Sequence, residues 1–83
     1  MIEEKNKFVT DLRGKTIMSA TGDILGIIDN FVVDTGNGAV KHVLVAPTEH
    51  LDLNKYKVDN MERLVLPFNK INAVKDVVVM APL

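Results

Sequence analysis

The triplet Asp34-Thr35-Gly36 is the part of the sequence most suggestive of chemistry, because it spells the catalytic triplet of aspartic proteases. Two such carboxylates held close together share one proton, which lets the pair act as acid and base. That fold also needs a later strand with a Gly beside the triplet, and this sequence has no Gly after Gly38. Asn37-Gly38 also favours a tight hairpin turn. We therefore interpret Asp34 as a turn residue whose side chain accepts hydrogen bonds from its own backbone.

Two His and two acidic residues offer a second candidate, a metal site. They are His42, Glu49, His50 and Asp52. Imidazole nitrogen and carboxylate oxygen are common ligands of Zn²⁺ and related ions. His42 lies in a predicted strand and the other three follow Pro47, so the fold could bring them together. His50 and Asp52 flank Leu51, however, in the manner of an exposed segment. We interpret the set as a strand histidine and a solvated loop, and predict no bound metal or other cofactor.

Phosphate binding and nucleophilic catalysis find little support. Gly22 and Gly26 are four residues apart, which matches neither the P-loop nor the dinucleotide-binding motif, and no long helix is predicted to follow them. Turns of a barrel account for both glycines. Ser19 is the one serine of the chain, and no sharp strand-to-helix turn is predicted to expose it. We predict that the protein is not an enzyme and has no catalytic residues.

Basic residues could instead contact RNA phosphates. They form two small clusters, one of Lys5, Lys7, Arg13 and Lys15 and one of Lys55 and Lys57. The aromatic residues that could stack on bases are Phe8, Phe31, Tyr56 and Phe68. They are not interleaved with the basic residues, as they would be in a typical RNA-binding surface. RNA or ribosome contact stays open as the less favoured alternative to ordinary solvated lysines.

Length and composition narrow the remaining classes. The 83 residues are enough for one domain, and a core of that size is marginal, so a second copy or a partner surface would help to stabilise it. The absence of Cys excludes disulfides, thiolate zinc sites and a cysteine nucleophile. A net charge of −1 argues against a general nucleic-acid or membrane binder. The longest apolar run, 77–83, is far too short to span a bilayer. We expect a cytoplasmic protein without membrane insertion.

The pattern of short β-rich runs separated by Gly, Asn, Asp and Pro predicts an all-β barrel or sandwich. The strongest signal is a long hairpin with arms over Ile27–Asp34 and Val40–Ala46, joined by a turn at Gly36-Asn37-Gly38. A shorter strand over Lys15–Met18 and a turn at Ala20–Asp23 are expected to precede it.

Apolar residues point to both faces of the predicted hairpin. Ile28 and Val32 share one face, whereas Ile27, Phe31 and Val33 share the other. A bulge that switches the inward face, a partner that covers the second face, or both would explain this. Gly26 suits such a bulge or a bend at a barrel corner.

The second half of the chain is less regular. Thr48–Asn60 is polar and is the expected place of partner contact. A single helical turn capped by Asp59 is expected next, followed by a strand over Arg63–Pro67. Asn69 is expected to cap another single turn over 70–72.

A closing strand is predicted over Val77–Met80. Because it is apolar on both faces, it must lie inside the barrel, be covered, or pair across a dimer. Together these elements predict one all-β domain, a barrel or a sandwich, with at most single-turn helices. Residues 1–7 are expected to be a flexible segment.

Several of these stretches resemble a known family when they are taken in order. They are Asp11-Leu12-Arg13-Gly14-Lys15, Thr21-Gly22-Asp23-Ile24-Leu25-Gly26, the strand 27–34, Leu64-Val65-Leu66-Pro67-Phe68 and the segment 71–79. This order is similar to the PRC-barrel family, the small barrel of the photosynthetic reaction-centre H subunit and of a bacterial ribosome maturation factor. The resemblance runs over residues 8–83 and implies one domain there, a small, partly open antiparallel β-barrel of five to six strands. Asn30 and Lys75 depart from residues common in the family, Asp and Gly, and are expected to alter a partner surface.

The resemblance implies a docking or assembly role without shared catalytic residues, since members serve in photosynthetic complexes, ribosome maturation and archaeal cell division. Stand-alone members of this length are mostly archaeal, and some are homodimers. We therefore expect an adaptor that binds an unidentified protein partner, works as a homodimer, and acts in an archaeal cell-division or other multiprotein complex. A ribosome- or RNA-processing accessory role is the alternative.

Overall fold

Six strands and two single-turn 3₁₀ helices make up the computed structural model, which describes residues 11–74 and 77–82. The strands are β1 (Thr16–Ser19), β2 (Ile24–Val33), β3 (Val40–Pro47), β4 (Leu64–Pro67), β5 (Ile71–Val74) and β6 (Val77–Met80). The 3₁₀ turns are η1 (Leu53–Lys55) and η2 (Phe68–Lys70). The predicted flexible segment 1–7, the domain start at residue 8 and Lys75 lie outside the described residues.

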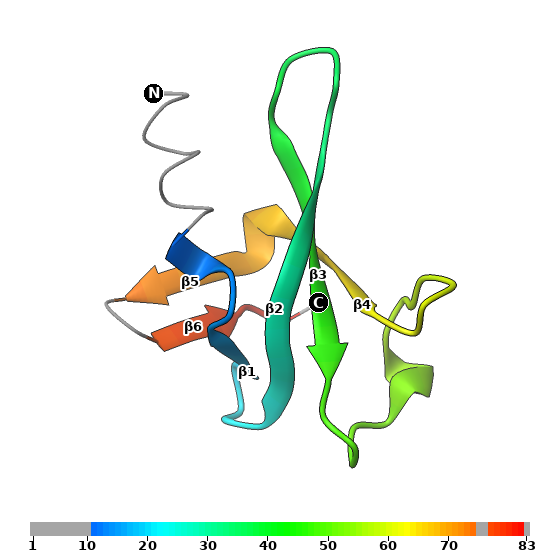
Figure 1. The fold of residues 1–83 in the computed structure, drawn as a ribbon. Coiled ribbons are helices and arrows are strands. Elements are labelled where there is room, and N and C mark those ends of the chain that lie inside the picture. The colour runs from blue at the N-terminus through cyan, green and yellow to red at the C-terminus, as the bar shows by residue number, and fades with distance from the viewer. Residues whose placement is uncertain (1–10, 75–76, 83) are drawn as a thin grey trace.

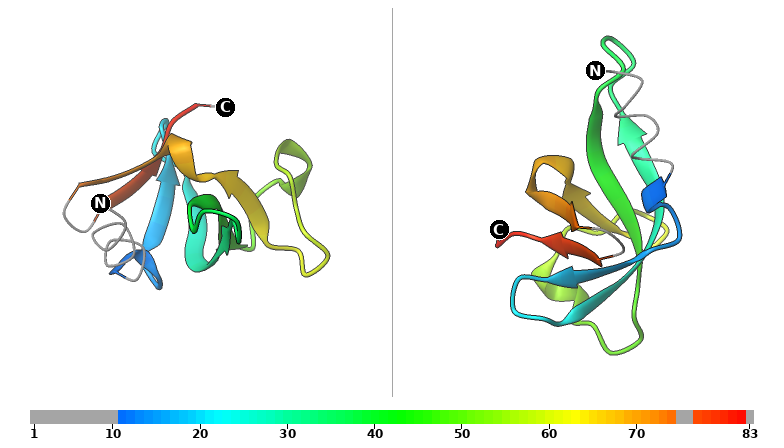
Figure 2. Two further views of the ribbon diagram at one scale, coloured as in Figure 1. Left: turned by 90° about the horizontal axis from the view of Figure 1, so that it is seen from above. Right: turned by 90° about the vertical axis from the view of Figure 1, so that its left-hand side faces the viewer.

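The six strands form one sheet in the order β4-β3-β2-β1-β6-β5 (Figure 1). The sheet curls round so that β4 lies on one side and β1, β6 and β5 on the other, as the view from above shows (Figure 2). β4 and β5 are the two end strands of the sheet, and they do not pair with each other in the described residues. The barrel is therefore not closed: it is open between β4 and β5. The predicted all-β, partly open barrel is confirmed.

The sheet is mixed. Among the described strands, four of the five pairings are antiparallel, as expected, and β1 with β6 is parallel, with Ile17 opposite Val78. The parallel pair arises because the chain leaves β4 through η2 and makes a second hairpin, β5–β6, whose last strand runs beside β1 in the same direction. The closing strand is thereby paired along both edges, which removes the hazard of an exposed apolar edge there.

The core lies inside the curl of the sheet. Ten apolar residues from the strands and the segment before β1 are buried and in mutual contact: Leu12, Ile17, Leu25, Ile28, Val43, Val45, Leu64, Leu66, Val78 and Met80. Phe31, Leu51, Tyr56 and Phe68 pack against them at the rim. Full burial of such side chains stabilises a fold by about 1.5–3 kcal/mol each.

A bulge in β2 changes which alternate residues of the strand face the core, so β2 contributes core side chains both before and after it. Ile28 pairs with Val45 and Asn30 pairs with Leu44, so Asp29 is the extra residue. Ile28 and Phe31 consequently both face the core although they are three residues apart. The predicted switch of the inward face is confirmed.

Gly26 lies where the backbone of β2 approaches the backbone of β3 closely enough to exclude a side chain. Its φ is +157°, and a Cβ there would overlap the carbonyl oxygen of Ala46 and lie 2.8 Å from that residue's carbonyl carbon. Only a residue without a Cβ permits this approach of two backbones.

Three local predictions differ from the structure. β2 begins three residues before the predicted strand, at Ile24. The predicted turn over 70–72 is wrong, because η2 spans Phe68–Lys70 with no side-chain cap, and Ile71–Val74 is the strand β5, which pairs with β6. Asp59 does accept backbone bonds, from the N–H groups of Met61 and Arg63, but the chain makes a tight turn there instead of a helical one.

Candidate protein-binding surface

Asp34 is held in the hairpin turn as interpreted from the sequence. Its Oδ1 accepts the backbone N–H of Gly36 at 2.7 Å, and its Oδ2 lies 3.3 Å from Nζ of Lys41. The N–H of Gly36 and then the Lys41 ammonium lower the pKa of the Asp34 carboxyl. Both oxygens are therefore engaged in fixing the turn that joins β2 to β3.

The candidate metal ligands lie in two separate places. His42 belongs to β3 and lines a shallow groove with Phe68 and Ile71, whereas His50 and Asp52 line a hollow beside Tyr56. Within residues 11–74 and 77–82, no three His, Cys, Asp or Glu side chains converge in a way that could hold a metal ion. The structure does not bring the set together.

Ser19 and Gly22 build the turn between β1 and β2. The Ser19 and Thr21 hydroxyls are 2.9 Å apart, and the N–H of Asp23 donates to Oγ of Ser19 at 3.1 Å. Gly22 takes a φ of +93°, as the turn requires. Of the basic residues, Lys5 and Lys7 lie outside the described residues, and Arg13 donates to Oδ1 of Asn30 at 3.1 Å.

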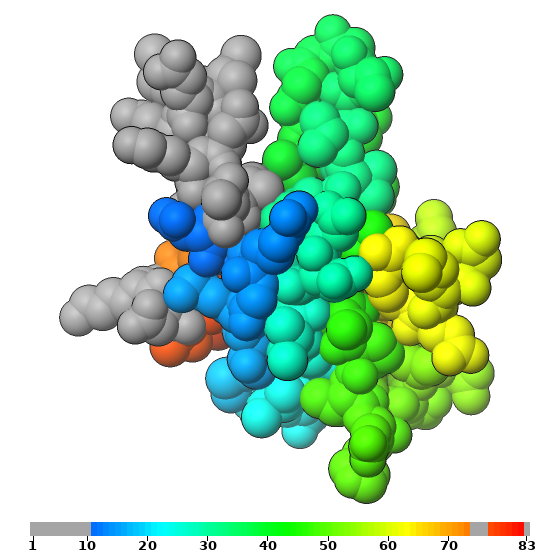
Figure 3. All heavy atoms as spheres, in the orientation of Figure 1, coloured from blue at the N-terminus to red at the C-terminus, as the bar shows by residue number. Residues whose placement is uncertain are grey.

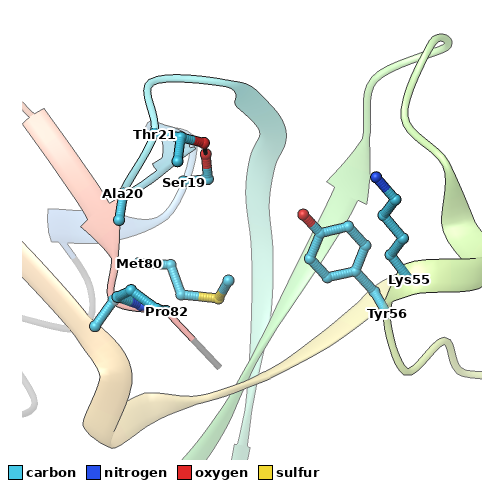
Figure 4. A pocket seen from close by; sticks show the side chains of 8 residues that line it. Ser19, Ala20, Thr21, Lys55, Tyr56, Met80 and Pro82 are labelled. Atoms are coloured by element: carbon cyan, nitrogen blue, oxygen red, sulfur yellow. Dashed lines mark hydrogen bonds between the residues drawn. The ribbon is translucent and has the colours of Figure 1, made fainter.

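A hollow of about 230 Å³ lies between the β1–β2 turn and the polar segment Thr48–Asn60 (Figure 4). Its lining is Ser19, Ala20, Thr21, Lys55, Tyr56, Met80, Ala81 and Pro82. Figure 4 shows Tyr56 and Lys55 on one side, facing the residues of the turn and of the end of β6 on the other. This lining has no carboxylate or imidazole that could act as a base, and its size suits one apolar side chain of a partner.

The outer face of β2, β3 and β4, which points away from the core, carries a row of apolar side chains. The register places Ile27 beside Ala46, Leu44 beside Val65, and Val32 beside His42. Ile27 is 51% exposed and Val32 40% exposed. Leu44 is buried, at 8% exposed, although it does not belong to the core cluster.

An ion pair crosses this outer face. Arg63 precedes β4, and its guanidinium lies 3.0 Å from Oδ2 of Asp29 in β2 and 3.0 Å from Oδ2 of Asp59. Because β3 lies between β2 and β4, the Arg63 side chain must pass over β3 to reach Asp29. The carboxylates raise the pKa of Arg63, and the N–H of Arg63 lowers the pKa of Asp59. No sequence signal indicated this pair, since Asp29 and Arg63 are 34 residues apart.

The distal part of the β2–β3 hairpin, residues 31–42, projects from the body of the molecule (Figures 1 and 3). We call it the hairpin arm. β2 has ten residues and β1 only four, and β1 pairs with β2 no further than Ile27. Val33 in this arm is 47% exposed. The arm therefore displays apolar side chains that one copy of the described chain does not cover.

Comparisons with known proteins agree with the fold. Residues 4–83 match the family model described as PRC-barrel domain. Comparison with curated proteins found no match to the chain. No helix in the described ranges is both long enough and apolar enough to cross a membrane.

Proposed function

The chain belongs to the PRC-barrel domain family, and from this membership together with its exposed apolar faces we propose that it is a non-enzymatic adaptor that docks another protein. The observation that carries the proposal is the outer face of β2, β3 and β4, where Ile27 is half exposed beside Ala46. Contiguous exposed apolar surface of this kind marks a protein–protein contact site, whereas single scattered apolar side chains do not.

The outer face has the composition of a docking surface. Covering the exposed half of Ile27 and the adjoining apolar atoms would yield about 1 kcal/mol per side chain. The Arg63–Asp29 pair beside them offers charged groups at the rim, which select a partner more than they add affinity. The polar segment Thr48–Asn60 and the hollow beside Tyr56 would extend the contact.

The setting of the adaptor forms part of the same proposal. The family resemblance supports an adaptor that is a homodimer and acts in a multiprotein complex in the cytoplasm. Archaeal cell division is one candidate for the process. An accessory role on ribosomes or in RNA processing is the competing function. The basic residues Arg13 and Lys15 would then matter more than Ile27.

Affinity purification from the native host, followed by mass spectrometry, tests the proposal. The wild-type chain should retain a defined protein whether or not nuclease is present, and Ile27→Lys should lose it. Asn72→Lys is the matched control, because it adds the same charge at an exposed site in β5, at the opposite end of the sheet order from β2, β3 and β4. Retention by Ile27→Lys, or a complex that nuclease and moderate salt dissolve, would contradict an adaptor docking on this face.

A further inference from the structure

The free edge of β2 in the hairpin arm is the feature that goes furthest beyond the adaptor role. The segment before β1 continues the pairing with β2 only as far as Ile28, whose C=O and N–H bond to Gly14 and Lys15. From Asn30 onward, no described strand pairs with the side of β2 that faces away from β3. Such an edge presents backbone donors and acceptors to any strand that can approach.

The hydrogen bonds show which groups this edge presents. The N–H of Phe31 donates to Oδ1 of its neighbour Asn30 at 2.8 Å and thus points away from β3, whereas the N–H of Asp34 donates to Ala39 across the hairpin. Backbone groups alternate between the two sides of a strand, so the N–H of Val33 also points outward. Phe31 and Val33 can therefore bond to an added strand without disturbing the ladder with β3.

We infer that two copies of the chain pair antiparallel along this edge about a two-fold axis, with Val32 of one copy opposite Val32 of the other. A two-fold axis perpendicular to a sheet matches each strand with itself, so one edge supplies both halves of the contact. Phe31 then lies opposite Val33 of the second copy and exchanges backbone bonds with it. The outcome is a continuous sheet through both copies. The inference specifies the contact of the proposed homodimer and does not depend on the docking of another protein.

Charge and space favour this register. Asn30 falls opposite Asp34 of the second copy, and Arg13, which bonds to Asn30, then approaches that carboxylate. Asp29 and Asp34 do not face each other, and each already has a cation of its own chain, Arg63 and Lys41. Pairing ends before Ile28, whose edge Gly14 and Lys15 occupy.

Solution mass and a single introduced cysteine test the pairing. Light scattering should give twice the 9.2 kDa of one chain, and Val32→Lys should halve that mass because it sets two ammonium groups face to face. Ile24→Lys is the matched control: it lies at the other end of the same strand, is 54% exposed and should leave the mass unchanged. Circular dichroism should show both variants folded.

The chain has no Cys, so Val32→Cys carries one thiol per copy. Facing residues that do not share hydrogen bonds have Cα atoms about 4.5 Å apart, within the range of a disulfide. At about 10 μM protein, paired thiols in the millimolar effective range should oxidise roughly 100-fold faster than those of Ile24→Cys. Equal rates for the two variants, or a monomeric wild type, would overturn the inference. Slow exchange of the Phe31 and Val33 amides in a monomeric wild type would overturn it as well.

Failure of this inference and failure of the adaptor role can be told apart. If Val32→Lys is monomeric and still captures the protein that the wild type retains, the adaptor role does not require the pairing of the arms. If Ile27→Lys loses that protein but keeps the doubled mass, both surfaces act as assigned. A wild type that captures its partner as a monomer rejects only the pairing of the arms.

Discussion

Gly26→Ala is the substitution that most directly tests how β2 is bent onto β3. The methyl group would overlap the carbonyl oxygen of Ala46 and lie 2.9 Å from Cα of Pro47. These are backbone atoms, so no side-chain rotation can relieve the contact. β3 has to move away from β2, and the core residues Val43 and Val45, which β3 carries, have to move with it.

The cost follows from two contributions. Overpacking a tight contact costs about 1–3 kcal/mol, and a side chain at a φ that favours glycine costs about 1–2 kcal/mol more. We expect the free energy of unfolding to fall by about 2–5 kcal/mol, out of roughly 4–12 kcal/mol for a domain of this length. At about 4–8 °C per kcal/mol, the Tm should fall by at least about 8 °C.

Thermal and urea unfolding followed by circular dichroism measure this loss, at one fixed protein concentration for all variants. Gly22→Ala is the control, because Gly22 has a φ of +93° but no atom within 4 Å of the added methyl group. It should bear only the conformational cost of about 1–2 kcal/mol. If the two variants lose equal stability, the close approach of β2 and β3 is not what fixes Gly26.

Two further predictions concern pH and metals. The pKa of Asp59 is lowered, chiefly by the N–H of Arg63, and that of Asp34 by the N–H of Gly36. Their stabilisation is therefore present above the unfolded pKa of about 3.9 and is lost as pH falls through the lower folded values. Urea midpoints measured from about pH 6 down to pH 2 should fall in the wild type and fall less in Asp59→Asn; parallel profiles would contradict this. Because His42 lies apart from His50 and Asp52, Zn²⁺ or a chelator should leave the Tm unchanged, and a rise with Zn²⁺ that His42→Ala abolishes would show that the ligands do converge.

Local features of the hairpin could be predicted from the sequence because they depend on neighbouring residues. Asn37-Gly38 indicated the turn, and the changing parity of Ile28 and Phe31 indicated the bulge that the structure places at Asp29. The interpretation of Asp34 as a turn residue was likewise local, since its acceptor bond reaches only to Gly36.

Features that depend on distant partners could not be predicted in the same way. Ile71–Val74 has no strong strand pattern of its own and becomes β5 because β6 lies beside it. The parallel β1–β6 pair and the Arg63–Asp29 ion pair join segments far apart in the chain. No periodicity or spacing in one sequence reports such contacts.

The unequal strand lengths are the physical basis of the proposed pairing through the arm. β1 has four residues and pairs with β2 no further than Ile27, so among the described strands only β3 lies beside the distal half of the ten-residue β2. Within the described ranges, the side chain of Asn30 lies at this edge, where its Oδ1 accepts bonds from the N–H of Phe31 and from Arg13. The N–H of Phe31 can readily exchange its bond to the Asn30 side chain for a bond to the backbone carbonyl of an added strand. The nearby Asp34–Lys41 and Asp29–Arg63 ion pairs disfavour an added strand whose charges do not match theirs. An edge guarded in this way resists indiscriminate pairing but accepts a strand that supplies both the carbonyl and the matching charges, and a second copy of β2 supplies both.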